Sequence, residues 1–147
     1  MTWKPNTTVA AILERDGKFL LVEEETDDGI RLNQPAGHLE EGETLIEAVI
    51  RETREETAYE FTPEFLLGVY HWQHPSKGIT YVRFAFTGSA GKHDPSLKLD
   101  DGILRAVWMS EAEIRASQDR HRSPQVMLCI DHYLAGQRLP LNAITHL

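Results

Sequence analysis

The stretch from Gly37 to Tyr59 reads GHLEEGETLIEAVIRETREETAY, and its pattern predicts an acidic amphipathic helix. Residues three and four apart are neighbours on a helix, so Glu52, Glu55 and Glu56 share one strip of its surface. Repulsion between Glu52 and Glu56 costs only about 0.2–0.5 kcal/mol if the pair is exposed, so the repulsion alone does not require a cation. A separate stripe of apolar and small residues follows the helical period: Ile46, Val49, Ile50, Thr53 and Thr57. One face of this helix is therefore expected to pack while another collects carboxylates.

Such a set of carboxylates indicates a site for a divalent cation. Hard oxygen ligands with few basic neighbours suit Mg²⁺ or Mn²⁺, and Mg²⁺ commonly bridges to substrate phosphates. We therefore expect Mg²⁺ as cofactor, with Mn²⁺ as an alternative. A salt-bridged surface helix without any ligand is the other interpretation, and the complete spaced set of charges argues against it.

The sequence also predicts where the helix begins and which residue holds its carboxylates in position. Thr44 followed by Glu47 matches a capping box, in which Thr44 is the N-cap and Glu47 reaches back to its amide. Arg51 lies four residues after Glu47 and four before Glu55, a spacing that predicts contacts with carboxylates on both sides. We interpret Arg51 as a residue that orients the acidic side chains.

The same segment resembles the Nudix box. In that pattern a glycine is followed after five residues by Glu, and after seven more by Arg-Glu, two further residues and Glu-Glu. The matching residues are Gly37, Glu43, Arg51, Glu52, Glu55 and Glu56. Three positions depart from the pattern: Thr53, Ala58 and Tyr59. Ala58 matters most because the family has glycine there, and glycine enters a left-handed turn that strains alanine, so the exit from the helix is expected to differ.

The resemblance implies a metal-dependent hydrolase of phosphoanhydrides. It assigns the catalytic set to Glu43, Arg51, Glu52, Glu55 and Glu56, and the metal ligands to the Gly37 carbonyl with Glu52, Glu55 and Glu56. Metal ions would neutralise phosphate oxygens and lower the pKa of a bound water. The general base stays open: it is one of the three glutamates or an acid outside the box. Asp100 and Asp101 are the outside candidates, although a plain turn role is favoured for both.

Patterns along the rest of the chain predict a mixed α/β fold. We expect strands at residues 7–13, 18–22, 65–72, 79–87 and 103–109, and polar loops at 26–33 and 88–101. Ser110 to Glu113 reads as a second capping box, and Ser123-Pro124 predicts the start of a helix that ends before Gly136. Helices on both faces of a sheet follow from this order, which matches the α/β/α sandwich with a mixed central sheet that the resemblance implies.

Length and composition bound the remaining possibilities. The 147 residues contain no Pro-, Gly- or Ser-rich linker, so we expect a single domain over residues 1–147. The formal net charge of −8 argues against binding to nucleic acid or to an anionic membrane. Cys129 is alone and the first residues lack a signal-peptide core, so a cytoplasmic setting is expected. The expected partner is a small nucleotide or pyrophosphate, and the expected assembly is a monomer or small homo-oligomer.

Residues outside the box resemble the NudJ-type phosphatase branch of the family. The matches are at residues 33–40, 71–72, 83–84, 122–124, 133, 136–138 and 140–141. That branch implies release of phosphate from nucleoside tri- and diphosphates and from hydroxymethylpyrimidine pyrophosphate, an intermediate of thiamine synthesis. Two alternatives stay open: a pyrophosphohydrolase of ADP-ribose or another nucleoside-diphosphate-X compound, and a catalytically silent nucleotide sensor.

Three residues are candidates for substrate binding. Trp72 could stack on a nucleobase, an interaction worth about 1–3 kcal/mol per base, or it could be a core residue. Arg83 and Arg122 could bind phosphate by paired hydrogen bonds, or form ordinary surface ion pairs. One glutamate in the run Glu23 to Glu25 is expected to face the same cleft.

Overall fold

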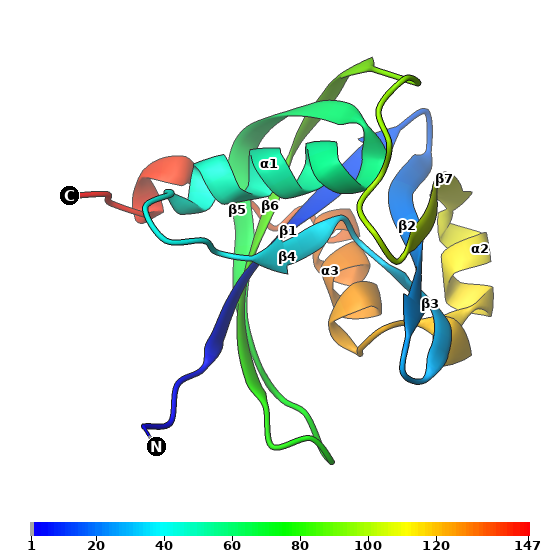
Figure 1. Cartoon of the computed structure of the whole chain (residues 1–147). Helices are drawn as coiled ribbons and strands as arrows, with labels where there is room; N and C mark the ends of the chain where they lie inside the picture. Colours follow the sequence, from blue (N-terminus) through cyan, green and yellow to red (C-terminus); the bar gives the residue numbers. More distant parts are fainter. Residues whose placement is uncertain (1) are drawn as a thin grey trace.

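The structure, a computed structural model, describes residues 2–147; Met1, part of the N-terminal stretch discussed above, lies outside the described residues. Figure 1 shows the arrangement of its elements. The first half comprises β1 (Asn6–Arg15), β2 (Lys18–Thr26), β3 (Gly29–Asn33), β4 (Ala36–His38) and α1 (Leu45–Thr57). The second half comprises β5 (Tyr59–Gln73), β6 (Thr80–His93), β7 (Ile103–Ser110), α2 (Glu111–Ala116), η1 (Gln118–Arg120), α3 (Gln125–Leu134), β8 (Leu139–Pro140) and η2 (Leu141–Ala143). None of the helices within this described range is long and apolar enough to cross a membrane.

The strands form a mixed sheet, as the sequence predicts, and their order in it is β3-β2-β1-β6-β5-β8. β1 and β6 run parallel, whereas the other neighbours along this path are antiparallel. β4 pairs with residues 8–10 of β1, and β2 pairs with residues 14–15 of the same strand. β7 pairs with residues 18–24 of β2, along the edge of β2 that faces away from β1 and β3. β2, β3 and β7 therefore diverge from the rest of the sheet on the side where β4 pairs with β1.

Side chains alternate along β1 between two hydrophobic cores. Val9, Ala11 and Leu13 pack in one core with Ala48 and Val49 of α1. Ile12 belongs to the other core, which contains Met127, Cys129 and Ile130 of α3. Figure 1 shows α1 and α3 on either side of the strands. This arrangement confirms the α/β/α sandwich.

Two predicted loops are partly strand. Residues 26–33 contain β3, whose backbone pairs with β2 from Val22 to Thr26. This strand is only five residues long, with two apolar residues, which is too short a run to stand out from a loop in the sequence. Residues 88–93 continue β6, even though they begin with Gly88. A β-carbon on Gly88 would lie 2.0 Å from the carbonyl oxygen of Thr62, so this glycine allows close approach of β5 instead of ending the strand.

The ends of α1 support one expectation and correct another. Thr44 Oγ1 accepts a hydrogen bond from the Glu47 amide at 3.1 Å, and Glu47 Oε1 accepts one from the Thr44 amide at 2.8 Å, which confirms the capping box. Ala58, however, adopts the left-handed conformation at φ 62° and donates its amide to the carbonyl of Arg54. The prediction that the helix ends differently from the family pattern is therefore wrong. Ala58 takes the left-handed conformation typical of glycine, at a cost of about 1–2 kcal/mol.

The other two helices begin close to where the sequence places them. Ser110 and Glu113 form the second capping box, and α2 follows at once. α3 begins at Gln125, just after Ser123-Pro124, and ends at Leu134, before Gly136. Ser123 Oγ accepts a hydrogen bond from the Gln125 amide at 3.2 Å, so this serine pairs with a backbone amide in the first turn of α3.

Candidate active site

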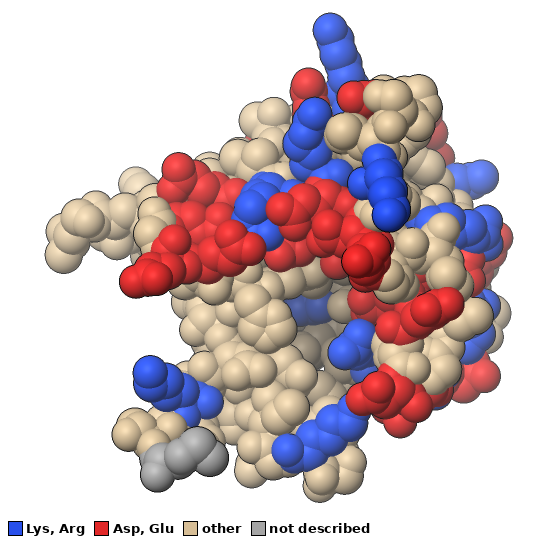
Figure 2. All heavy atoms as spheres, viewed as in Figure 1, with Lys and Arg blue, Asp and Glu red and all other residues tan. Residues whose placement is uncertain are grey.

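A cavity of about 470 Å³ lies where β4 and the β2-β3 unit diverge. Such a volume suits a small-molecule ligand. One helix and three strands contribute residues to its walls: Glu52 and Glu56 on α1, Gly37 on β4, Trp72 on β5 and Arg83 on β6. Figure 2 shows a hollow beneath the acidic band that follows α1, with Lys or Arg atoms inside it. Opposite charges therefore line different walls of one cavity.

Arg51 connects the acidic residues of α1 to one another. Its guanidinium donates to Glu43 through Nη2 at 2.7 Å and through Nε at 3.0 Å. Its Nη1 donates to Glu52 at 2.8 Å and to Glu55 at 3.2 Å. The paired hydrogen bond to Arg51 lowers the pKa of Glu43, and the same bond raises the pKa of Arg51. Arg51 therefore holds three carboxylates in fixed positions.

One expected contact of Arg51 is not made. The helical spacing predicts an ion pair with Glu47, but the carboxylate of Glu47 accepts from the Thr44 amide in the capping box. Glu43, which precedes the helix, occupies the position beside Arg51 instead. The contact with Glu55 is formed as predicted.

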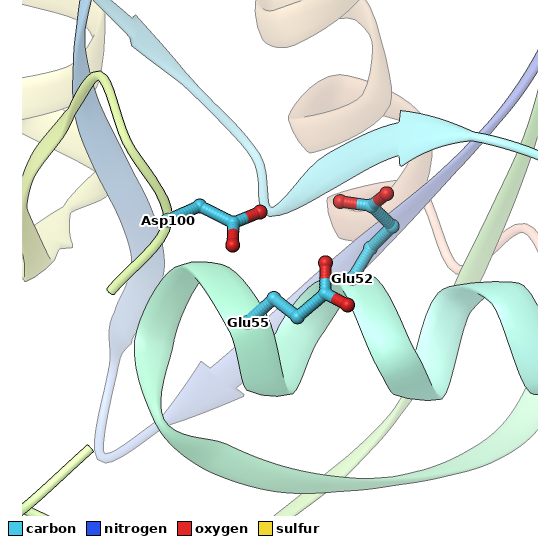
Figure 3. Close-up of side chains that lie close together, drawn as sticks. All are labelled: Glu52, Glu55 and Asp100. Atoms are coloured by element: carbon cyan, nitrogen blue, oxygen red, sulfur yellow. The ribbon is translucent and has the colours of Figure 1, made fainter. Parts of the chain in front are cut away.

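Glu52 and Glu55 meet a third carboxylate, that of Asp100. One oxygen from each residue lies within 4.8 Å of the others. Figure 3 shows the carboxylates of Glu52 and Glu55, both from α1, near the carboxylate of Asp100, which comes from the loop before β7. The Asp100 amide donates to the carbonyl of Glu55 at 3.0 Å, which fixes this loop against the helix. Asp100 therefore has a place in the site beyond the turn role favoured for it, whereas Asp101, exposed like Asp100, does not belong to the cluster.

Glu56 does not belong to this three-carboxylate cluster. Its side chain is buried beside Glu52, and its Oε1 accepts the Ala36 amide at 2.9 Å. Burial raises the pKa of Glu56 to about 9, although the Ala36 amide opposes this effect, and the nearby charge of Glu52 adds to it. Burial likewise raises the pKa of Glu52 to about 7, against the lowering effect of Arg51. The pKa of Glu55 is also raised, chiefly by burial and in part by the charge of Asp100.

Gly37 lies directly against this acidic group. A β-carbon at this position would come 2.1–2.3 Å from the carboxylate atoms of Glu52, so only glycine leaves that carboxylate where it is. β4 places Gly37 there by pairing it with Val9 of β1.

These residues fit a divalent cation. Three carboxylates converge on one point, and burial makes the ionised forms of Glu52 and Glu55 costly. A doubly charged ion offsets both the repulsion and the desolvation, and carboxylate oxygens are the ligands that Mg²⁺ and Ca²⁺ take in proteins. The donor set of Glu52, Glu55 and Asp100 thus suits a hard cation.

Trp72 lies at the wall of the cavity and outside the two hydrophobic cores. It stacks on its cross-strand partner Tyr81, with ring centroids 5.8 Å apart and an angle of 18° between the planes. His74 contacts it from the next turn, at 5.1 Å between centroids. The core interpretation applies to Tyr70 instead, which packs beneath α3 and shares a hydrogen bond with His132.

Arg83 is buried, with 3% of its surface exposed, so the surface ion pair considered for it is wrong. Its Nη1 donates to Gln34 Oε1 and its Nη2 to Asn33 Oδ1, both at 2.9 Å. Within residues 2–147 no carboxylate lies within ion-pair distance of this guanidinium. A buried cation without an acidic partner costs free energy that an anionic or strongly accepting ligand would offset.

Arg122 does form the ion pair considered for it. Its Nη1 lies 2.9 Å from Glu24, and both residues line the cavity. Glu24 is thus the glutamate of the second strand that faces the cleft. Its neighbour Glu23 pairs with Arg105 and Arg120 away from the cavity.

Some residues in or behind the cavity wall could not be assigned to a site from the sequence. Gln34, behind Arg83, lies in a stretch that the family resemblance marks, but its link between Arg83 and the Val126 carbonyl is visible only in three dimensions. Tyr81, Ser123 and Gln125 line the cavity itself, and of these only Ser123 lies in a stretch that the sequence marks. They come from β6 and from the start of α3, far along the chain from α1, so no local spacing relates them to the box.

Comparisons with known proteins agree with this geometry. The family model for the NUDIX domain matches residues 3–128. The chain is 39% identical to phosphatase NudJ of Escherichia coli K12 over 142 residues, which are 97% of this chain and 92% of that protein. A solved NUDIX hydrolase from Nitrosomonas europaea is 54% identical, covers 98% of both chains and superposes with a TM-score of 0.96. A MutT NUDIX hydrolase from Burkholderia pseudomallei shares the fold, with 19% identity, a TM-score of 0.76, and coverage of 88% of this chain and 98% of its own. The chain belongs to the Nudix family.

Proposed function

We propose that this protein is a Mg²⁺-dependent hydrolase that releases phosphate from nucleoside tri- and diphosphates and from hydroxymethylpyrimidine pyrophosphate. The observation that carries the proposal is the cluster of Glu52, Glu55 and Asp100 at the edge of a cavity that also contains the buried guanidinium of Arg83. Membership of the Nudix family supports hydrolysis of pyrophosphate-type bonds. The likeness to phosphatase NudJ over nearly the whole chain supports the choice of substrates.

The proposed metal ligands are Glu52, Glu55 and Asp100, together with Glu56 and the Gly37 carbonyl that the family resemblance implies. When bound, Mg²⁺ supplies neutralisation of phosphate oxygens and a lower pKa for a coordinated water. Arg51 and Glu43 act as positioning residues, because Arg51 bonds Glu43 on one side and Glu52 with Glu55 on the other. The proton of the attacking water passes to one of the four acidic groups, Glu52, Glu55, Glu56 or Asp100.

The substrate's phosphates would lie between the carboxylate cluster and the basic side chains of the cavity. Arg83 is the stronger candidate for phosphate binding, because its charge has no carboxylate partner, whereas Arg122 already pairs with Glu24. The Trp72–Tyr81 pair offers a flat surface for a nitrogen heterocycle. We further propose that residues 1–147 form one catalytic domain that acts in the cytoplasm on small molecules.

A substrate screen tests this function. The purified protein is incubated with Mg²⁺ and a panel of nucleotides, thiamine-pathway pyrophosphates and ADP-ribose, and the released products are identified. Orthophosphate from a terminal group is the expected product. Nucleoside monophosphate with ribose phosphate would instead indicate an ADP-ribose pyrophosphohydrolase, and binding without turnover would indicate a nucleotide sensor.

Variants then test the proposed site. Glu52→Gln and Glu56→Gln should each lower the rate by about 10²–10⁴-fold, the range for a lost acid–base or electrostatic group. Glu41→Gln is the matched control, since Glu41 is an exposed glutamate just before α1. Hydrolysis by Glu56→Gln at the unaltered rate would remove Glu56 from the mechanism, and the same result for Glu52→Gln would contradict the proposed metal site.

A further inference from the structure

Gln125, the first residue of α3, combines burial with an unused hydrogen-bonding atom. Only 8% of its surface is exposed, and the side chain lines the cavity. Its Oε1 is buried and has no hydrogen-bond donor; among the side chains of residues 2–147, no other buried nitrogen or oxygen atom lacks a partner. Buried polar atoms are nearly always paired, so an exception at the wall of a cavity points to a ligand.

The neighbours of Gln125 determine which end of the amide is free. Its Nε2 donates to Ser123 Oγ at 3.3 Å, and the backbone amide of Gln125 donates to the same oxygen at 3.2 Å. Ser123 therefore holds the NH₂ group and leaves the carbonyl oxygen unbonded. The terminal torsion of glutamine is soft, so the amide can rotate to turn this oxygen towards a ligand in the cavity.

Gln125 lies at the Arg83 end of the cavity. Gln34 accepts from Arg83 through Oε1 and donates through Nε2 to the carbonyl of Val126, the residue after Gln125. The carboxylates of Glu52 and Glu56 come from α1, which packs on the opposite face of the sheet from α3. A substrate whose phosphates extend from the carboxylate cluster to Arg83 would thus present its ring beyond Arg83, to the wall formed by Gln125 and Trp72.

We propose that Gln125 is a specificity-determining residue that accepts a hydrogen bond from an amino group on the substrate's nitrogen heterocycle. This inference rests on the proposed function. An amino group, as on cytosine or adenine, supplies the missing donor. A carbonyl at the same position, as on uracil or hypoxanthine, places oxygen against oxygen and leaves the glutamine oxygen unpaired. Sites that contain a buried polar group reject ligands that fail to pair with it.

Matched substrate pairs test the proposal. The values of kcat and KM are measured with Mg²⁺ for CTP against UTP and for ATP against ITP, pairs that differ in an amino group or a carbonyl. We expect kcat/KM to favour the amino member of at least one pair by about tenfold, the equivalent of one hydrogen bond made instead of missed. The difference should reside mainly in KM, because the contact lies away from the reacting phosphate.

Three variants separate this role from a structural one. Gln125→Met keeps the length of the side chain but removes both polar groups, and should bring the two members of a pair within about twofold of each other. Gln125→Glu keeps an acceptor and should retain the preference for the amino member. Gln118→Met is the matched control, because Gln118 is exposed and outside this cavity, and it should leave the ratio unchanged.

Equal kcat/KM values in both pairs, a preference for the carbonyl member, or an unchanged ratio in Gln125→Met would overturn the proposal. Binding of CMP and UMP, measured by calorimetry on the wild type and on Gln125→Met, gives a second readout that needs no turnover. Tighter binding of CMP that is lost in Gln125→Met supports the role of Gln125 even if the chain hydrolyses no nucleotide, a result that would refute only the proposed function. Equal binding of CMP and UMP, together with equal binding of the matching purine pair AMP and IMP, would refute the role of Gln125.

Discussion

Gly37 of β4 and Glu52 of α1 lie so close that a β-carbon on Gly37 would be 2.1 Å from the carboxyl carbon of Glu52. Strand β4 thus contacts α1 at Glu52, whose carboxylate belongs to the three-carboxylate cluster. Because the Glu52 carboxylate is the end of a flexible side chain, a larger residue at position 37 would displace the carboxylate before it disturbed the fold.

The variant Gly37→Ala should therefore lose metal binding more than stability. We expect the affinity for Mg²⁺ or Mn²⁺ to fall about 10–100-fold, as for other changes that displace a ligand. The free energy of unfolding of the metal-free protein should fall by less than about 2 kcal/mol. Calorimetric titration and denaturant unfolding measure the two effects. Gly91→Ala is the control, since its β-carbon would contact the Glu60 side chain at 3.1 Å, outside the site.

Asp100 and Asp101 provide a second, sharply matched comparison. Both residues are exposed, but Asp100 contributes a carboxylate to the cluster, whereas Asp101 lies beside Lys98. Asp100→Asn removes one negative charge from the cluster and should weaken metal binding by about tenfold. Asp101→Asn should change it less than twofold. Equal effects of the two substitutions on metal affinity would show that only the general charge of the loop matters.

Metal affinity should rise with pH. Burial raises the pKa of Glu52 to about 7 and that of Glu56 to about 9, so the metal-free protein holds protons that a cation must displace. Affinity for Mg²⁺ should increase between about pH 6 and 9, by up to roughly tenfold per pH unit where one proton is released per ion. Titrations in buffers of different ionisation enthalpy count the protons released. A flat profile over this range would contradict ionisation linked to binding.

The same raised pKa values predict the opposite trend for stability without metal. Folding holds protons on Glu52 and Glu56 that the unfolded chain releases near pH 4.5, so stability should fall as pH rises from there towards 9. The melting temperature in the presence of chelator measures this, and Mg²⁺ should restore the loss. Glu56→Gln should flatten the upper part of the curve, because it removes the group with the higher pKa.

Loss of Arg51 from α1 should be costly for the stability of the protein. Arg51→Ala leaves Glu43, Glu52 and Glu55 without their shared donor, so stability should fall by about 2 kcal/mol. Arg51→Lys should recover only part of this, since an ammonium cannot reproduce the planar set of contacts. Arg54→Ala is the control, because Arg54 is exposed on the same helix; its effect should stay below about 0.5 kcal/mol. Denaturant unfolding compares the three, and similar losses for Arg51→Ala and Arg54→Ala would exclude a bracing role.

The sequence by itself determined what depends on near neighbours along the chain. The capping box of Thr44 and Glu47, the strip of glutamates on α1 and the contact of Arg51 with Glu55 all follow from helical spacing, which acts over a few residues. The family follows from the same local pattern. Even so, spacing predicted Glu47 as one partner of Arg51, and the path of the chain before α1 places Glu43 there instead.

Only the tertiary structure decided which distant residues share the cavity. Asp100 joins Glu52 and Glu55 because the loop before β7 binds the carbonyl of Glu55, and nothing in the local sequence specifies that approach. Arg83 is buried because α3 and the segment before β4 close over it, although an arginine in an alternating strand usually faces solvent. Long-range packing sets burial, and burial sets the pKa values and the unpaired groups on which the proposed chemistry depends.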